Sequence, residues 1–211
     1  MRSKPNHMIN KQNEKNKTAI SSNSIWTIYE DDSHNLWLGT FGGGLSIFDR
    51  TKETFTNFKN DPNDPSSLGD DNIIRVFKDS KNNMWIGTTK GFCRYYRDSK
   101  KFTTYREKDG LANDFVYGIL EDDNGNLWLS TNNGLSKFDP QKETFKNYYY
   151  EDGLQRNEFN QNAFAKDFRT GRLLFGGPNG LNIFNPVDLT ENDYFPPIVF
   201  TNYLRYNTDD E

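Results

Sequence analysis

A short motif that recurs along the chain restricts its possible folds more than any other feature. The segment Asn35-Leu-Trp-Leu-Gly-Thr returns as Asn83-Met-Trp-Ile-Gly-Thr and as Asn126-Leu-Trp-Leu-Ser-Thr. A weaker fourth copy, Arg172-Leu-Leu-Phe-Gly-Gly, has Leu174 in place of tryptophan. The copies are spaced by roughly 40 to 50 residues, which is the period of the blades in a β-propeller. The sequence therefore predicts four structural repeats.

Each repeat reads as four short strands. In the first repeat, Ile25-Trp-Thr-Ile-Tyr is apolar on both faces, as expected of an innermost strand that lies between neighbouring blades. Leu36-Trp-Leu-Gly-Thr follows, and Leu45-Ser-Ile-Phe-Asp alternates apolar and polar side chains with a period of two. Thr54-Phe-Thr-Asn-Phe is short and partly polar, as suits an edge. The predicted fold class is all-β, a propeller of four four-stranded antiparallel blades.

Composition supports this fold and excludes some partners. Only 33% of the residues are hydrophobic but 15% are aromatic, which suits short strands better than a helical bundle. The net charge is -4 and both signs are mixed along the chain, so no basic stripe is present to neutralise phosphates and no nucleic acid partner is expected. The single cysteine, Cys93, cannot form an internal disulfide.

The repeat also sets the predicted boundaries. Residues 1–19 are polar, with positive charge but no apolar stretch behind it, so we expect a disordered lead-in rather than a secretory signal. Residues 188–211 are expected to form a linker and the start of another domain. No apolar run reaches the roughly 18 residues that span a bilayer, so no membrane contact by the chain itself is expected. The predicted blades are residues 20–67, 68–110, 111–153 and 154–187.

The three tryptophans of the motif, Trp37, Trp85 and Trp128, allow two interpretations. They could be aromatic platforms on which sugars stack. They could instead be wedges between blades, buried with the indole N–H bonded to a neighbouring carbonyl. One tryptophan in each regular repeat, flanked by apolar residues, favours the wedge. We therefore interpret them as structural residues.

The loops that enter each innermost strand carry the predicted ligand site. Propeller geometry places these loops on the same face as the turns between the second and third strands, and loops on a rigid scaffold commonly bind ligands. For any single residue, the favoured alternative is a side chain that only closes its own turn. The equivalent positions of the four loops are Asn23, Asp71, Asp114 and Asn157.

The chain offers little for catalysis. Its two histidines, His7 and His34, fall in the lead-in and in a turn, and no nucleophile elbow or metal-ligand histidine pair is present. Asp122-Asp-Asn-Gly-Asn resembles the start of a calcium loop but lacks the glutamate required at the twelfth position. We therefore expect no metal, no cofactor and no enzymatic activity.

The repeats resemble a known family. The segments from Ile28 to Asp49 and from Gly118 to Asp139 are similar to two-component regulator propeller repeats, found in the sensor regions of hybrid two-component histidine kinases. Phe175-Gly-Gly-Pro-Asn-Gly-Leu-Asn-Ile-Phe-Asn-Pro resembles the closing blade of that family, and Pro196-Pro-Ile-Val-Phe-Thr-Asn-Tyr resembles the first strand of its three-tyrosine β-sandwich domain.

The resemblance implies a periplasmic sensor that detects a ligand, often a glycan fragment, and passes the signal into a phosphorelay. Any kinase activity would reside in domains that this chain lacks, and without a signal sequence the chain as it stands would remain cytoplasmic. Four blades are few for these repeats, so we expect a partial or open propeller. Its open edges would then contact the remaining blades, a histidine kinase partner or another copy of the chain.

Three functions are compatible with a propeller of this kind. The leading one is a non-catalytic ligand-sensing module, the C-terminal part of an extracytoplasmic sensor propeller. The second is a free-standing propeller that holds another protein. The third and most distant is a propeller lyase, which needs a histidine and a carboxylate converging on a metal. His34 has no counterpart in the other repeats, which disfavours the lyase.

Overall fold

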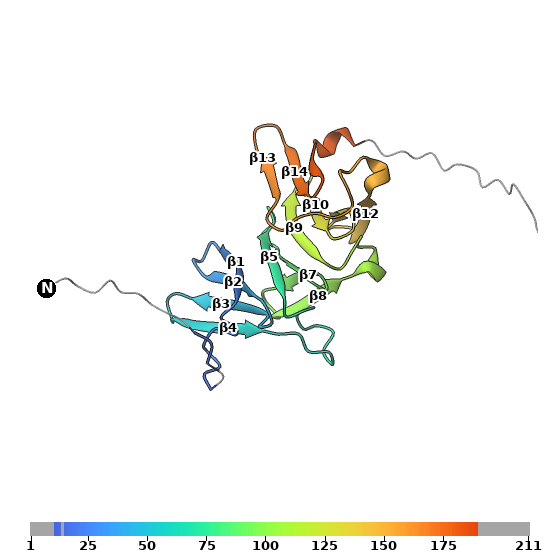
Figure 1. Ribbon diagram of the computed structural model, residues 1–211. Helices are drawn as coiled ribbons and strands as arrows, with labels where there is room; N and C mark the ends of the chain where they lie inside the picture. The colour runs from blue at the N-terminus through green and yellow to red at the C-terminus, as the bar shows by residue number, and fades with distance from the viewer. Residues whose placement is uncertain (1–10, 14, 190–211) are drawn as a thin grey trace, which may run out of the picture.

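The computed structural model describes residues 11–13 and 15–189, and it confirms an all-β partial propeller. Four antiparallel sheets follow one another along the chain as blades (Figure 1). Within each blade the strands pair in sequence order, so that every connection is a hairpin. The predicted first strand of a β-sandwich, beginning at Pro196, lies outside the described residues.

The first three blades have four strands each, and the fourth has three. The first blade contains β1 (Ile25–Glu30), β2 (Leu36–Thr40), β3 (Leu45–Asp49) and β4 (Thr54–Phe58). The second contains β5 (Ile73–Lys78), β6 (Met84–Thr88), β7 (Gly91–Tyr96) and β8 (Lys101–Tyr105). The third contains β9 (Val116–Glu121), β10 (Leu127–Thr131), β11 (Leu135–Asp139) and β12 (Thr144–Tyr148). The fourth contains β13 (Phe164–Asp167), β14 (Arg172–Gly177) and β15 (Gly180–Phe184).

Three short 3₁₀ helices complete the described part of the chain. They are η1 (Glu107–Asp109), η2 (Tyr150–Asp152) and η3 (Pro186–Asp188). The third of them replaces the outer strand that we expected in the fourth blade. Pro186 fixes φ and has no N–H to donate, and the side chain of Asn185 accepts a hydrogen bond from the N–H of Val187. The chain therefore coils after β15 instead of forming another antiparallel strand within the described residues.

Residues 16–20 lie against the outer strand of the first blade. The N–H of Phe55 donates to the carbonyl of Thr18 (3.0 Å), and the amide of Asn57 donates to the carbonyl of Ala19 (2.8 Å). Ile20 is buried with Leu38 and Phe55. The last residues that the sequence assigned to a disordered lead-in thus hold the edge of β4.

Successive blades pack through large aromatic contacts at equivalent positions. Each motif tryptophan is buried and meets an aromatic ring on the third strand of the following blade. The ring centroids are 4.9–5.5 Å apart, within the range of favourable aromatic pairs. The pairs are Trp37–Tyr95, Trp85–Phe138 and Trp128–Phe184. The core therefore lies between the blades, and a single blade could not bury it alone.

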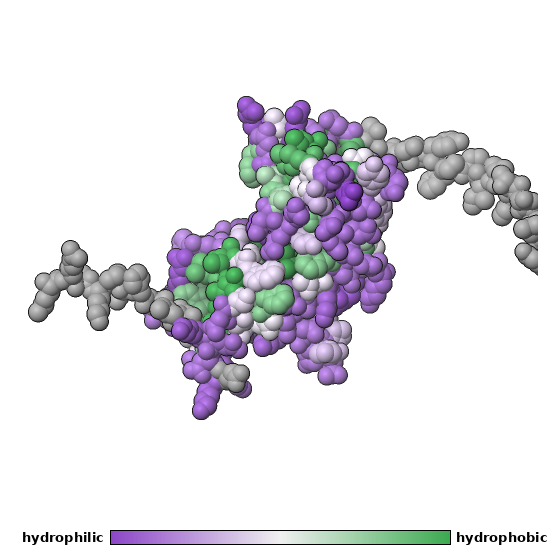
Figure 2. Space-filling model, viewed as in Figure 1, coloured by the Kyte–Doolittle hydropathy of each residue, from purple (hydrophilic) through white to green (hydrophobic). Residues whose placement is uncertain are grey.

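The inner strand of the first blade differs from the expectation. We predicted that β1 lies between neighbouring blades, but Ile28 is 62% exposed, whereas its equivalent Ile119 in the third blade is 0% exposed. No blade precedes β1 among the described residues, so this face has no cover. Figure 2 shows apolar side chains gathered over this part of the first blade, and a second apolar group near β13 and β14.

This difference gives a matched pair of substitutions. Ile28→Ala should lower the free energy of unfolding by less than about 0.5 kcal/mol, because the side chain already contacts solvent. Ile119→Ala should lower it by about 2–5 kcal/mol, because it leaves a cavity between two blades. Urea denaturation of both variants measures the difference. Equal losses would show that the face of β1 is covered in solution.

Candidate functional site

The four loop residues predicted as a ligand site form hydrogen bonds within their own loops. In each case the side-chain oxygen accepts a backbone N–H from an earlier residue, at 2.6–2.8 Å. For Asn23, Asp71, Asp114 and Asn157 in turn, the donors are Gln12, Asn60, Glu107 and Tyr150. These contacts are those of loop closure, so the side chains organise the face on which they lie.

The backbone of three of these residues also joins neighbouring blades. The carbonyls of Asp71, Asp114 and Asn157 accept the N–H groups of glycines in the preceding blade, at 2.5–2.9 Å. The donors, Gly44, Gly91 and Gly134, all have positive φ, which glycine adopts without strain. These glycines lie at the turns between the second and third strands, so the entry loops and those turns do share one face. We call it the loop face.

Two aromatic side chains on the loop face were missed by the sequence interpretation. Trp26 and Phe41 stack with their ring centroids 4.7 Å apart and their planes at 17°. They are 41% and 46% exposed, and the indole N–H of Trp26 donates to Ser24. Trp26 lies at an irregularity in the pairing of β1 with β2. Its equivalent in the second blade is the buried Ile74. A tryptophan at a position that holds isoleucine in the next repeat was the signal that the sequence offered.

The third blade carries a related arrangement. Tyr117 takes the place of Trp26, packs on Phe115 at 4.5 Å and donates through its hydroxyl to Asn132 at 3.3 Å. Burial raises the pKa of the Tyr117 phenol, and the charge of Glu158 adds to the effect, so the hydroxyl stays a donor at neutral pH. Half-buried aromatic rings beside amide groups can bind a ring-shaped polar ligand such as a sugar.

Polar side chains occupy the corresponding part of the second blade. Thr89 donates to the buried carboxylate of Asp70 at 2.5 Å, and the ammonium of Lys90 lies 4.0 Å from the same carboxylate. Asn72 accepts the N–H of Gly42 in the first blade. The loop face therefore combines aromatic rings from the first and third blades with a polar stretch from the second.

The described part of the chain provides no metal centre. Among residues 11–13 and 15–189, no group of three or more histidine, cysteine, aspartate or glutamate side chains could hold a metal ion. His34 is exposed in the β1–β2 turn, where its ring nitrogen pairs with Glu30 at 2.9 Å.

The motif tryptophans are tied to the blades by a carboxylate rather than by the backbone carbonyl that we expected. Each indole N–H donates to an aspartate six residues earlier, at 2.8–3.0 Å. The other carboxylate oxygen accepts the N–H groups two and four residues after the aspartate. The pairs are Asp31–Trp37, Asp79–Trp85 and Asp122–Trp128. The six-residue spacing, repeated three times, was the sequence signal.

The ionised carboxylate is the form that this arrangement stabilises. Burial by itself would raise the pKa of Asp31, but the hydrogen bonds from Trp37, Asn35 and Ser33 outweigh it, and Arg97 adds a further bond. The pKa of Asp31 therefore lies below its usual value. Because the folded-state pKa is lower than the unfolded one, the stabilisation is complete above about pH 4 and is lost as the pH falls through the folded-state pKa.

A pH-dependent stability difference tests this pair. Trp37→Phe removes the indole donor and should lower the free energy of unfolding by about 1–3 kcal/mol at pH 7. The gap from the parent should narrow below about pH 4, when Asp31 takes up a proton. Trp26→Phe, on an exposed ring, is the control with no such dependence. A gap for Trp37→Phe that stays constant from pH 7 to pH 3 would contradict the role of the charge.

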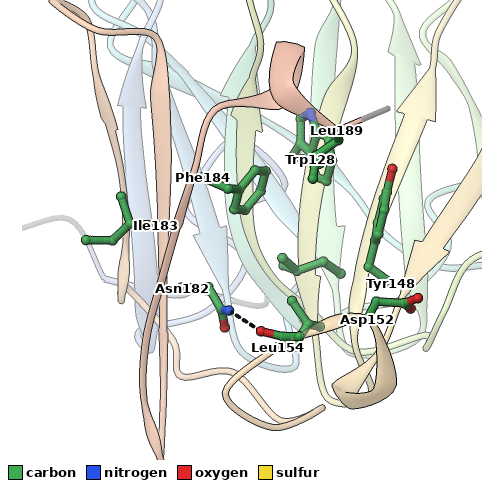
Figure 3. A pocket seen from close by; sticks show the side chains of 10 residues that line it. Trp128, Tyr148, Asp152, Leu154, Asn182, Ile183, Phe184 and Leu189 are labelled. Carbon is green, nitrogen blue, oxygen red and sulfur yellow. Dashed lines mark hydrogen bonds between the residues drawn. The ribbon is translucent and has the colours of Figure 1, made fainter. Parts of the chain in front are cut away.

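A cavity of about 160 Å³ lies between the third and fourth blades. Figure 3 shows Trp128, Tyr148, Phe184 and Leu189 around it, with the amide of Asn182 donating to the carbonyl of Gly153. In the other blades the position equivalent to Phe184 pairs with a phenylalanine of the outer strand. Those phenylalanines are Phe55, Phe102 and Phe145.

The polar groups around this cavity already have protein partners. The Asp152 carboxylate accepts the N–H of Tyr149, and Asn182 accepts the N–H of Gln155. The cavity therefore marks the position that an outer strand occupies in the other blades, and we do not assign it a ligand.

Comparisons with known proteins agree with the fold. The family model described as two component regulator propeller matches residues 19–42, 67–90 and 110–133. The chain is similar to the extracellular domain of the hybrid two component system BT3049 from B. thetaiotaomicron, with 30% identity and a TM-score of 0.71. This match covers 84% of the chain and 24% of that structure.

A second solved structure shows the same fold. The extracellular domain of the one component system BT4673 from B. thetaiotaomicron is 23% identical with a TM-score of 0.66, and the match covers 79% of this chain and 23% of that one. The chain thus spans about a quarter of the length of these neighbours. No curated protein matches it. No helix within residues 11–13 and 15–189 is long and apolar enough to cross a membrane.

Proposed function

This chain belongs to the two-component regulator propeller family, and we propose that it is the C-terminal part of the extracytoplasmic, periplasmic sensor propeller of a two-component regulatory system. Three matched repeats and the similarity to an extracellular domain of a hybrid two component system support this role. In this role the chain is non-catalytic. It binds a ligand, and other domains carry the phosphorelay.

The loop face is the ligand site in this proposal, and the exposed Trp26–Phe41 stack is the observation that carries it. Binding of a ligand over an apolar ring that is exposed on a polar loop face is favourable, because it removes the ring from water. Sugars present a flat apolar face together with hydroxyl groups, which matches stacked rings beside amide and carboxylate groups. The proposed ligand is a glycan fragment.

The open face of the first blade is a second, separate contact surface. It carries the exposed Ile28 and the half-buried Phe48 where the third blade has Ile119 and Phe138, which another blade covers. A surface built like a blade-to-blade interface favours a further blade as its partner. A histidine kinase subunit or another copy of this chain are the other candidates, and a free-standing protein-interaction propeller is the second candidate function.

Titration with neutral oligosaccharides tests the ligand site. Cello-, malto-, xylo- and mannohexaose would be added to the chain and binding followed by calorimetry. We expect one of them to bind, and Trp26→Ala or Phe41→Ala to weaken it by roughly tenfold or more, as is typical for a central aromatic contact. Phe168→Ala is the matched control, because this ring is 89% exposed in the β13–β14 turn.

Two results would contradict the proposal. Binding by Trp26→Ala and Phe41→Ala that equals the parent would place the ligand elsewhere. Absence of binding by any of the four probes, in a chain that melts cooperatively, would remove the evidence for a glycan sensor.

A further inference from the structure

The guanidinium of Arg75 has no ionic or hydrogen-bonding partner in the part of the chain that the structure describes. Arg75 lies on β5, the inner strand of the second blade, and is partly buried. Its Nε–H is enclosed and donates to no oxygen of the described residues. The one interaction of the group is with the ring of Phe164 in the fourth blade, 5.0 Å from the guanidinium carbon to the ring centroid.

Several other half-buried cations of the described chain have oxygen partners. Arg94 donates to the amide oxygen of Asn83 at 2.8 Å. Arg106 donates to the carbonyl of Gly69, and Lys166 donates to the carboxylate of Asp123. Arg75 has no such partner, although a buried N–H group without one is costly.

The electrostatic surroundings of Arg75 contain no compensating charge. Burial lowers the pKa of Arg75, and no carboxylate of the described residues acts against that shift. An arginine remains charged even so, because its pKa is far above neutral. Arg75 is therefore a charged side chain with no compensating carboxylate among the described residues.

The ring of Phe164, on which the guanidinium lies, packs closely against the third blade. Gly118 of β9 lies where the third blade meets the fourth, and a Cβ on this residue would collide with the Phe164 ring. The Oγ of Ser130 is 2.7 Å from the position that this Cβ would occupy. That hydroxyl is buried and has no hydrogen-bond partner among the described residues. Phe164 thus joins the cation of Arg75, from the second blade, to an aromatic ring of the fourth blade that packs against Gly118 of the third.

This cluster lies close to the loop face. Arg75 directly follows Ile74, the position that holds Trp26 in the first blade and Tyr117 in the third. A guanidinium that stacks on a ring keeps its N–H groups in plane, where they can bind both oxygens of a carboxylate.

We propose that Arg75, with its guanidinium over the ring of Phe164, binds the carboxylate of an acidic sugar. The inference rests on the proposed glycan-binding function and specifies its ligand class, a glycan that contains a uronic acid. A sulfate group offers the same anionic oxygens, so the test must separate the two.

The experiment compares glucuronate, glucose and sodium sulfate as probes of the whole chain at constant ionic strength. Binding is followed by calorimetry and by the NMR signal of the Arg75 Nε–H. We expect glucuronate to bind at least roughly tenfold more tightly than glucose and to shift that signal, as a charge-assisted hydrogen bond would. In Arg75→Met the preference should vanish, whereas Arg172→Met, at an exposed arginine of β14, should retain it.

Stability distinguishes a ligand site from a structural contact. Arg75→Met removes an unpaired charge and keeps the apolar stem, so its urea midpoint should equal or exceed that of the parent. A marked fall in the midpoint with glucuronate binding intact would overturn the proposal, because Arg75 would then only fasten the second blade to the fourth. Equal binding of glucose and glucuronate, or binding of sulfate alone, would overturn it as well.

The outcome is separable from that of the proposed function. If a neutral hexaose binds through Trp26 but glucuronate shows no preference for Arg75, the glycan-sensing function stands and the acidic-sugar assignment fails. If neither the hexaoses nor glucuronate bind, both fail.

Discussion

The structure depends on a tryptophan that must satisfy two requirements at once. Its ring is buried between two blades, and its N–H needs a partner inside that apolar layer. The aspartate six residues earlier meets the second requirement, because the hairpin between the first two strands brings its carboxylate to the indole. The same carboxylate closes the hairpin through two backbone N–H groups. One interaction thus fixes the turn of a blade and the contact with the next blade.

A chain built in this way is stabilised mainly between neighbours. Each of the first three blades supplies a tryptophan face to the blade that follows it. Contacts of this nearest-neighbour kind make the two ends of an array different from its middle. The first blade lacks cover on β1, and the fourth has Leu174 in place of the tryptophan, with Leu181 and Ile183 exposed. The ends of the arc are therefore the most exposed apolar parts of the described chain.

Much of this fold could be predicted from the sequence, because the repeat itself encodes it. The spacing of Trp37, Trp85 and Trp128 predicted the blades, and the alternation of apolar residues predicted their strands. The three-stranded fourth blade was missed because the alignment of the repeats gave no weight to Pro186, which begins η3 two residues after β15 ends. The exposure of Ile28 was missed because the burial of a strand depends on whether another blade covers it, and the strand's own sequence does not record that.

The candidate site was harder to predict, for a related reason. Alignment of the repeats selects positions that are alike in every blade, such as Asp71, Asp114 and Asn157, and those positions hold the loops and join the blades. A ligand that contacts several blades at once needs a different group from each. Trp26, Arg75 and Tyr117 are such groups, at or next to the same irregular point of the inner strands. In a repeat protein the shared residues therefore describe the scaffold, and the departures from the repeat on one face are the better guide to what it binds.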